Sequence, residues 1–232
     1  MTPELAAIYT VLLLVLTNLF GLVYSYTVLY TPIFKSFRIQ DKVYKTGVLK
    51  ERLPLYLFNL FILLTISGVG AYFFFPFFDT NSMNLMIVVV QVIVAFIADD
   101  IWFYFMHRFM HENKFLLKKI HSIHHRSSTP FPLEYLYAHP VEWMSGMLGA
   151  LLAFAAIMIV MPINIYAFWL FGLLRNLHEI HIHSDLELPY LSKIPLLSKT
   201  KHHDDHHAFL NGNYASTFLW LDRLFKTNFT KK

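Results

Sequence analysis

The sequence contains no cysteine among its 232 residues. This absence excludes a disulfide framework, a zinc–thiolate site, an iron–sulfur cluster and a cysteine nucleophile. Charged residues are also scarce, at 15% of the chain against 56% hydrophobic residues, whereas a soluble domain carries about 25% charged residues. Such a chain has too few polar groups to cover a soluble surface. The composition therefore excludes a disordered chain, a nucleic-acid-binding module and an ordinary cytosolic enzyme, and it indicates a membrane protein.

Long uncharged runs suggest how the chain crosses the bilayer, since a span needs about 20 apolar residues. The apolar blocks cover about 8–29, 55–78, 83–97, 144–161 and 163–174. We expect the first block to be a retained span, because no basic segment precedes it as in a signal peptide. We expect the last two blocks to form a hairpin at about 141–177, because the ring of Pro162 removes a backbone donor there. The sequence therefore predicts an all-α membrane protein with about four transmembrane helices, counted as two spans plus a helix pair or hairpin.

Basic residues are absent between the second and third blocks, and they flank those blocks on the other sides. The basic residues are Lys35, Arg38, Lys42, Lys45, Lys50 and Arg52 before the second block, and Arg108, Lys114, Lys118, Lys119 and Arg126 after the third. Loops rich in Lys and Arg face the cytoplasm and its anionic membrane lipid. We therefore expect the N-terminus on the far side, and the C-terminal half, including Lys232, on the cytoplasmic side.

Histidine is missing from residues 1–106, and all 13 histidines lie between His107 and His207. They form four clusters and one isolated residue: His107 and His111; His121, His124 and His125; His178, His181 and His183; His202, His203, His206 and His207; and His139. Residues three and four apart share a helix face, so we expect each cluster to direct its rings at one point. Neutral imidazole suits iron, zinc, copper and nickel. So many nitrogens exceed the needs of one tetrahedral ion, and they indicate two metal ions with open positions.

Three carboxylates accompany the histidines, and two of them, Asp100 and Glu142, each leave two interpretations open. Asp99 and Asp100 follow an apolar run, where ionisable groups are costly and are functional or paired. Asp100 precedes His107 by seven residues, two helical turns, so it is either an acceptor for an imidazole N–H or an interfacial charge at a helix end. Glu142 is either a helix-N-terminal acid or another acceptor beside the metal ligands.

These motifs together resemble the fatty acid hydroxylase/sterol desaturase superfamily. The resemblance rests on the segments HRFMH, HSIHH, YAHPVEW and HHDDHH and extends over about residues 98–227. The segments TPFPLEYLYAHPVEW and HHDDHHAFLNGNYASTFLWLDRLFKT are similar to C-4 methylsterol oxidases. Sterol C-5 desaturases and cholesterol 25-hydroxylases share much of the pattern. We therefore expect a transmembrane region over 1–97 and a catalytic domain over 98–232.

The resemblance implies a four-helix membrane bundle with a cytoplasmic helical cap that holds a non-haem di-iron centre. Carried over by motif, the expected ligands are His107, His111, His121, His124, His125, His183, His203, His206 and His207. His183 is the best match of its cluster, because HSDLELP is similar to the HSG or HDG segment of the sterol enzymes. Further candidates for ligands or for partners of ligands are His139, His178, His181, His202, Asp100 and Glu142.

The implied activity is oxidation of a C–H bond of a sterol-like lipid by O2. The sequence has no haem-binding, flavin or G-x-G-x-x-G motif. Electrons are therefore expected from a separate protein such as cytochrome b5, a ferredoxin or a reductase. Hydroxylation and desaturation stay open, as do sterol, fatty acyl and carotenoid substrates. The expected location is the endoplasmic reticulum in a eukaryote and the inner membrane in a bacterium.

Three rival interpretations make different predictions. A zinc membrane hydrolase would use three or four ligands and a general base, leaving half of the histidines idle. A metal transporter would place histidines or acids at mid-membrane, whereas the first two apolar blocks have none. The third rival is a catalytically inactive relative with a purely structural role. The oxygenase interpretation requires that rings from distant segments meet in one two-metal pocket.

Overall fold

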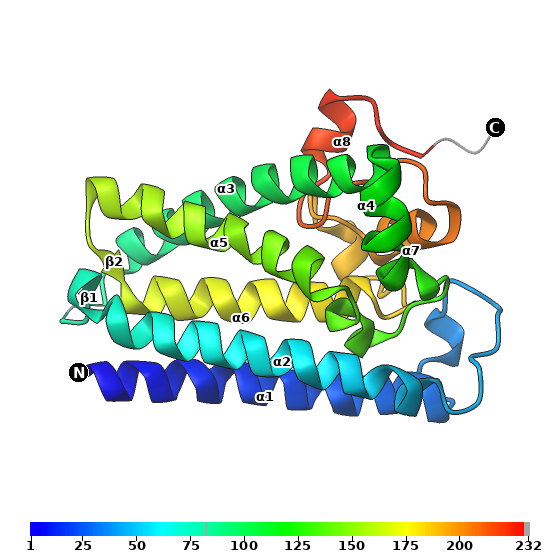
Figure 1. Ribbon diagram of the computed structural model, residues 1–232, viewed down its shortest axis with the longest axis horizontal. Coiled ribbons are helices and arrows are strands. Elements are labelled where there is room, and N and C mark those ends of the chain that lie inside the picture. Colours follow the sequence, from blue (N-terminus) through cyan, green and yellow to red (C-terminus); the bar gives the residue numbers. More distant parts are fainter. Residues whose placement is uncertain (82, 230–232) are drawn as a thin grey trace.

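The computed structural model describes residues 1–81 and 83–229. Within them, five long helices run side by side along the molecule, as Figure 1 shows. They are α1 (Pro3–Tyr30), α2 (Val48–Phe73), α3 (Leu85–Glu112), α5 (Pro140–Val160) and α6 (Ile165–Ile182). In the described part of the chain, four of these, namely α1, α2, α3 and α5, are long and apolar enough to cross a membrane. The all-α membrane architecture is therefore confirmed.

Short elements cover one end of this bundle, which we call the cap end (Figure 1). They include α4 (Lys114–Lys119), η3 (His121–Arg126), η4 (Pro132–Leu136), η5 (Leu191–Lys193), α7 (Thr200–Phe209) and α8 (Trp220–Leu224), with η1 (Lys35–Phe37) in the loop between α1 and α2. At the opposite end, η2 (Phe75–Phe77) precedes β1 (Phe78–Asp79), which pairs in parallel with β2 (Ile163–Asn164). Lys232, expected on the cytoplasmic side, lies outside the described residues.

The chain turns at Pro162, between α5 and α6, where the sequence predicts the turn of a hairpin. Helix α5 ends at Val160 and α6 begins at Ile165, with Pro162 between them. The carbonyl of Pro162 accepts a hydrogen bond of 2.9 Å from the side-chain amide of Gln91 on α3. This bond joins the turn of the hairpin to the neighbouring helix.

Two helices differ from their predicted bounds. Helix α2 begins at Val48 rather than near residue 55, and it continues through Pro54. Helix α3 does not end near residue 97 but extends to Glu112. It continues because both acids in its middle have partners: Oδ2 of Asp99 pairs with Arg175, and Asp100 accepts hydrogen bonds from a distant loop. Charges that have partners do not end a helix, so the first histidine pair lies on the same helix as the third span.

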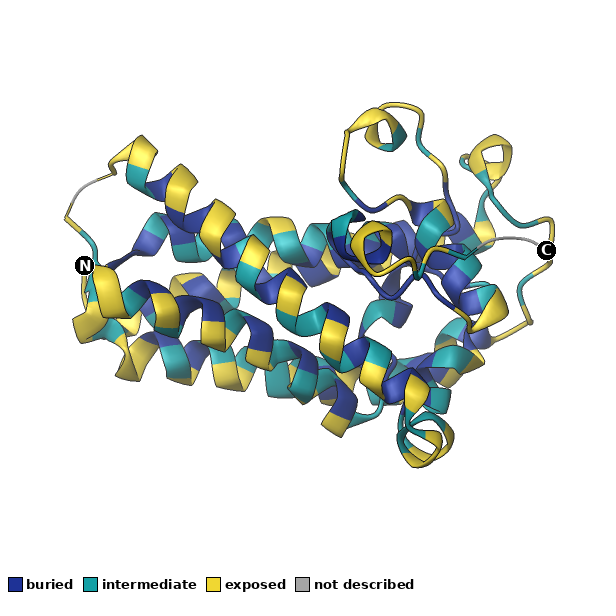
Figure 2. Ribbon diagram, turned by 90° about the horizontal axis from the view of Figure 1, so that it is seen from above, coloured by how far each residue is buried: buried dark blue, intermediate teal, exposed yellow. Residues whose placement is uncertain are grey.

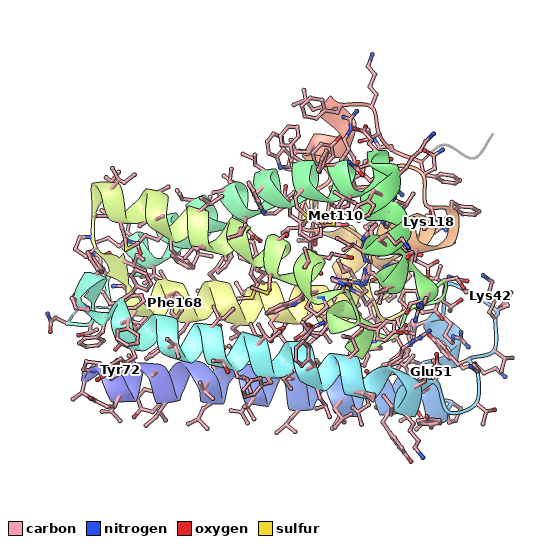
Figure 3. The ribbon with its side chains drawn as sticks, viewed as in Figure 1. Lys42, Glu51, Tyr72, Met110, Lys118 and Phe168 are labelled. Carbon is pink, nitrogen blue, oxygen red and sulfur yellow. The ribbon has the colours of Figure 1, made fainter. Side chains whose placement is uncertain are left out.

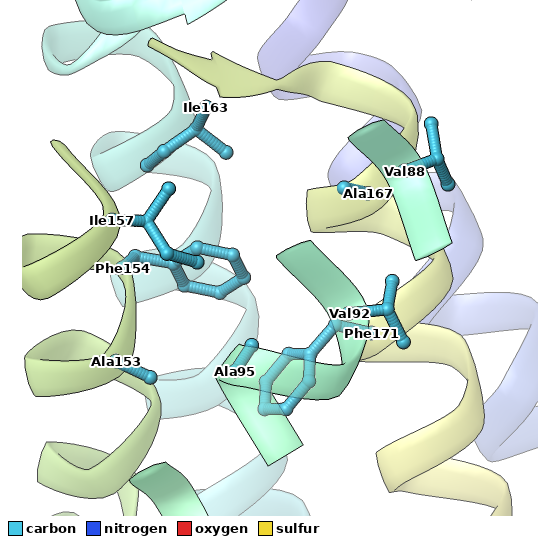
Figure 4. Close-up of a cluster of buried hydrophobic side chains, with 9 residues drawn as sticks. All are labelled: Val88, Val92, Ala95, Ala153, Phe154, Ile157, Ile163, Ala167 and Phe171. Atoms are coloured by element: carbon cyan, nitrogen blue, oxygen red, sulfur yellow. The ribbon is translucent and has the colours of Figure 1, made fainter. Parts of the chain in front are cut away.

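Aliphatic and aromatic side chains join α3, α5 and α6 far from the cap end. Figure 4 shows the cluster formed by Val88, Val92, Ala95, Ala153, Phe154, Ile157, Ile163, Ala167 and Phe171. The outward faces are also apolar: Leu16 is 64% exposed, Phe61 67% and Ile159 86%. Exposed apolar surface on this scale would be unfavourable in water and is what a helix in lipid requires. Figure 2 shows these exposed residues along the bundle and the buried ones concentrated toward the cap end.

Candidate metal centre

Nine of the histidines in the described residues gather into two groups at the cap end. The five-histidine group consists of His107, His111, His121, His125 and His206, and the four-histidine group of His124, His183, His203 and His207. Within each group, one ligand atom per residue lies within 4.8 Å of all the others. These are the nine residues that the sequence motifs single out as ligands. Rings from four separate segments therefore meet, as the oxygenase interpretation requires.

The structure corrects one expectation, because the two H-x-x-H-H clusters do not each point at one place. His121 and His125 belong to the five-histidine group, but His124 belongs to the other. In α7 the division is reversed, since His203 and His207 lie in the four-histidine group and His206 in the other. Neighbouring residues differ in direction by about 100° on the α-helix α7 and by about 120° on the 3-10 helix η3. Both segments lie between the two groups and contribute to each.

Within each group the Nε2 atoms face one another. In the five-histidine group, Nε2 of His121 lies 2.7 Å from Nε2 of His111, 2.8 Å from that of His125 and 3.2 Å from that of His107. In the four-histidine group, Nε2 of His203 lies 3.0 Å from that of His183 and 3.1 Å from that of His207. A neutral ring nitrogen carries either one proton or one lone pair, so it cannot satisfy three nitrogen neighbours. A cation at the centre of each group satisfies them all.

The outer ring nitrogens explain why Nε2 points inward. Nδ1 donates to a backbone carbonyl in five cases: His107 to Tyr214 (2.8 Å), His124 to Tyr137 (3.2 Å), His183 to Glu179 (2.8 Å), His206 to Gly212 (2.8 Å) and His207 to Ser127 (2.9 Å). A proton held on Nδ1 leaves the lone pair on Nε2. Nε2 of His206 is buried and has no hydrogen-bond partner among the described residues. This donor set fits metal ions.

Burial keeps these rings in the form that binds metal. Desolvation, together with the neighbouring His183, lowers the pKa of His124 to about 3. Desolvation likewise lowers the pKa of His121, His125, His203, His206 and His207 well below the ordinary value. A neutral imidazole has a free lone pair for a metal ion, whereas a protonated one has none.

Glu142 lies beside the five-histidine group. Its Oε1 is 2.8 Å from Nδ1 of His121, and the carboxylate is in the first turn of α5. Both interpretations of Glu142 therefore hold at once: it is an acid near a helix N-terminus, and it contacts a candidate ligand on the side away from the group. A carboxylate in that position fixes the ring and raises its basicity.

Asp100 does not contact an imidazole, and that expectation is corrected. Its Oδ1 accepts backbone N–H bonds of 3.1 Å from Thr217 and from Phe218, and its Oδ2 accepts from the indole of Trp220 at 2.9 Å. The two-turn spacing from His107 is present, but the loop after α7 reaches Asp100 first and occupies both oxygens. Asp100 therefore attaches this loop to α3.

Four other candidate histidines lie outside both groups. His139 caps α5 by accepting the N–H of Val141 at 3.2 Å. Nε2 of His202 lies 2.9 Å from the carboxylate of Asp222. His178 contacts the carbonyl of Ser216 at 3.0 Å, and His181 lies between the hydroxyls of Tyr24 (3.4 Å) and Thr200 (3.3 Å). Their ring nitrogens are used in contacts that hold α6, α7 and the loops together.

Sequence reasoning missed a cluster of charged side chains next to the two histidine groups, formed by Asp99, Arg175 and Glu179. Nε of Arg175 donates to Oδ2 of Asp99 at 2.6 Å, and Oε1 of Glu179 accepts from the hydroxyl of Ser216. Arg175 and Glu179 are four residues apart on α6, which is otherwise mostly apolar. Charged residues at that spacing in a largely apolar helix were the available signal.

A small cavity joins the two groups. It has a volume of about 70 Å³ and is lined by His107 of one group and by His124, His183 and His203 of the other. Its apolar wall comes from α3 and α5 and includes Phe103, Met106, Met110, Trp143, Gly146 and Met147. Figure 3 labels Met110 at the cap end of α3. The cavity therefore connects the histidines with the space between two membrane-length helices.

Comparison with known proteins agrees with this geometry. The model of the fatty acid hydroxylase family matches residues 92–227, which include all nine grouped histidines. The chain belongs to the fatty acid hydroxylase family. The similarity of this fatty acid hydroxylase family member to single relatives extends beyond the matched region, to as much as 86% of the chain. No solved structure is significantly similar to it.

Similar relatives are named methylsterol monooxygenase or very-long-chain aldehyde decarbonylase. Methylsterol monooxygenase 1 of Rattus norvegicus is 34% identical over 179 residues, covering 74% of this chain and 59% of the relative. Methylsterol monooxygenase 1 of Danio rerio is 32% identical over 207 residues, covering 86% and 69%. A very-long-chain aldehyde decarbonylase of Oryza sativa subsp. indica is 34% identical over 210 residues, covering 84% and 75%. The chain thus spans about three fifths of the length of the rat relative.

Proposed function

We propose that this chain is a membrane-bound non-haem di-iron oxygenase that oxidises a C–H bond of a sterol-like lipid with O2 and electrons from a separate protein. One observation carries the proposal: a five-histidine and a four-histidine group lie side by side, and one cavity reaches both. That cavity opens toward helices that can cross a bilayer. Two all-imidazole groups suit a pair of iron ions, since imidazole is a good iron ligand.

A zinc hydrolase fits the geometry less well. Structural zinc is four-coordinate and catalytic zinc has three protein ligands with a water activated by a general base. The five-histidine group has more ligands than either site uses. Its nearby carboxylate, Glu142, contacts His121 instead of standing free beside an open coordination position. The grouped histidines lie at the cap end of the bundle, whereas a metal transporter would need them midway along the spans.

The protein's own residues have three tasks in this proposal. Five carbonyls and Glu142 hold Nδ1 of six of the nine grouped rings, so that Nε2 of these rings keeps its direction when electrons enter or leave. The Phe and Met side chains of α3 and α5 exclude water from the cavity and receive hydrocarbon. No side chain here can break an unactivated C–H bond, so bound iron with O2 would supply the oxidising power.

The lipid class and the donor are inferred from the relatives and from the cavity. Two of the relatives described above are named for methylsterols, and the cavity wall on α3 and α5 is apolar. We therefore favour a sterol-like lipid over a carotenoid. Cytochrome b5, a ferredoxin or a reductase would supply electrons at the cap end, where basic residues such as Lys118 are exposed.

The proposal also assigns an orientation in the membrane and a role to each of the two parts of the chain. All the basic loops that the positive-inside rule assigns to the cytoplasm lie at the cap end (Figure 1). We infer that the cap end faces the cytoplasm, of the endoplasmic reticulum or of a bacterial inner membrane. Residues 98–232 would carry the catalytic part, and residues 1–97 would form the membrane region packed against it.

Two measurements test the proposed function. Purified protein loaded with ferrous iron under anaerobic conditions should hold about two irons per chain. Lipid profiling of cells with and without the gene, grown with oxygen, should show accumulation of one lipid and loss of its oxidised product when the gene is absent. Stoichiometric zinc with full activity after iron is removed would contradict the proposal, and so would identical lipid profiles.

A further inference from the structure

Arg175 and Glu179 project from α6 into the cavity that touches both histidine groups. They are one helical turn apart, and Glu179 directly precedes the segment that carries His183. The rest of the cavity is lined by histidines, by apolar side chains of α3 and α5, and by Tyr135, Ala138 and Glu142. A charged pair in this place is next to the reacting atoms of any bound lipid.

Arg175 has hydrogen-bonding capacity that the protein does not use. Only its Nε is bonded, to Oδ2 of Asp99, and its two terminal nitrogens make no hydrogen bond with residues 1–81 or 83–229. Oδ1 of Asp99 is buried and likewise without a partner among those residues. Pairs of arginine with a carboxylate are frequently two-pronged. Here the guanidinium is bonded at one edge, and its side chain stays 22% exposed beside the cavity.

Glu179 complements Arg175 as an acceptor. Its Oε1 accepts from the hydroxyl of Ser216, and no described residue donates to its Oε2. The charges of Asp99 and Glu179 together offset the guanidinium, so the cavity has no excess positive charge. Glu179 would repel the carboxylate of a charged ligand at close range, whereas it would not repel a neutral oxygen.

We propose that Arg175 and Glu179 bind a neutral hydroxyl or carbonyl oxygen of the lipid, immediately beside the carbon that is oxidised. The guanidinium donates a hydrogen bond to this oxygen. Where the oxygen belongs to a hydroxyl, Glu179 accepts a hydrogen bond from it. This rests on the proposed function and narrows its substrate class to lipids oxygenated close to the reacting carbon. A free fatty acid or a bond in the middle of an acyl chain is disfavoured.

The size of the cavity supports the same arrangement. At about 70 Å³ it exceeds the roughly 10–15 Å³ that one water needs, so it has room for a small group at one end of a lipid. The oxygen and its neighbouring carbons fit between α6 and the histidines. The remaining hydrocarbon would run along the apolar wall formed by α3 and α5, past Met106 and Met147.

Binding to metal-free protein tests the proposal separately from any activity. The probes are matched pairs: a 4-methylsterol and its analogue without the hydroxyl group, then octadecanol and octadecanal against octadecane, with octadecanoate as the charged comparison. Binding is followed in nanodiscs of one lipid composition through the fluorescence of Trp143, which lines the cavity. A Trp143→Phe variant gives the signal from the other tryptophans.

The wild-type protein should bind the oxygenated member of at least one pair about tenfold or more tightly, as one hydrogen bond to a charged group provides. Arg175→Lys keeps a cation for Asp99 but loses the planar fork, and it should lower this preference to below about threefold. Asp99→Asn with Arg175→Gln serves as a neutral replacement if the lysine variant does not fold. Iron loading of these variants should equal that of the wild type.

Glu179→Gln separates recognition from structural support. Its amide oxygen still accepts from Ser216, but it no longer offers a charged acceptor. It should weaken the preference for octadecanol and the methylsterol and leave that for octadecanal unchanged, because an aldehyde has no proton to donate. Arg223→Lys, an exposed arginine on α8 that does not line the cavity, is the matched control and should leave all preferences unchanged.

Three results would overturn the proposal. The first is that the wild type binds both members of every pair equally or binds neither. The second is that the Arg175 variants keep the preference of the wild type. The third is that octadecanoate binds more tightly than octadecanol. A failure of the oxygenase proposal would appear instead as missing iron or unchanged lipid profiles, with these binding results intact.

Discussion

His124 and His125 are neighbours in the chain, yet their rings belong to different histidine groups, with ring centroids 5.6 Å apart and planes at 70°. His125 shares its group with His121, one turn earlier, and His124 shares its group with His183 of another segment. The pair therefore lies between the two groups and lets each be tested separately.

Replacing either residue should remove one metal ion and leave the other. His125→Ala removes one of five ligands, whereas His124→Ala removes one of four. The loss of iron should therefore be more complete in His124→Ala. We expect iron per chain to fall from about two toward about one in each variant and oxygenase activity to be lost. Metal analysis with Mössbauer spectroscopy on iron-57-loaded protein measures both.

The matched control is His139→Asn, which keeps a capping side chain on α5 and lies outside both groups. It should retain both irons. Full iron content in both the His124 and the His125 variants would show that these rings are not ligands.

Glu142→Gln should weaken metal binding to the five-histidine group only. The carboxylate lies 2.8 Å from Nδ1 of His121, and loss of such a partner costs about 10- to 100-fold in metal affinity. Titration against a chelator of known affinity should resolve one weakened and one unchanged site. Two sites weakened equally, or neither, would contradict this role for Glu142.

Two glycines on α5 should respond differently to alanine. A Cβ at Gly149 would overlap Oδ1 of Asp99 and come within 3.1 Å of Trp102. A Cβ at Gly146 would meet Met106 at 3.7 Å, an ordinary contact. We expect Gly149→Ala to destabilise the protein by about 1–3 kcal/mol through overpacking.

The Gly146→Ala protein is the control, and it should be neutral or up to about 1 kcal/mol more stable, because alanine favours the helix. Thermal unfolding in one detergent compares the two. Equal melting temperatures for both variants would mean that α3 and α5 do not pack as closely as the structure has them.

Glu134 should make stability depend on pH. Burial raises the pKa of its carboxyl to about 7, although Arg52, which donates to it at 2.9 Å, lowers it. A group whose pKa is higher in the folded state stabilises the protein fully below its unfolded value of about 4.3, and this contribution is lost as the pH rises through 7. The contribution changes by at most about 1.4 kcal/mol per pH unit.

Glu134→Gln removes this titration, and it also removes the charge opposite Arg52. The melting temperature of the wild type relative to the variant should therefore fall between pH 4.5 and pH 7. Melting curves of both proteins across that range are the measurement. A difference that stays constant or grows with pH would contradict the raised pKa of Glu134.

The amino-acid sequence alone determined which residues gather and where the chain is apolar. Histidine has few roles that require so many copies, and hydrophobic runs of membrane length depend on local composition, so the nine grouped histidines and the hairpin at Pro162 were predictable. The contacts of Asp100 were not, because its partners Thr217, Phe218 and Trp220 lie more than a hundred positions away.

Only the tertiary structure decided how the histidines divide and what surrounds them. Spacing places His203, His206 and His207 on neighbouring faces of one helix, but the position of that helix between the groups sends His206 one way and the other two the opposite way. The pairing of Arg175 with Asp99 likewise joins two helices across 76 positions. Local periodicity sets the direction of a side chain around its own helix axis, and the packing of helices against one another sets what it meets there.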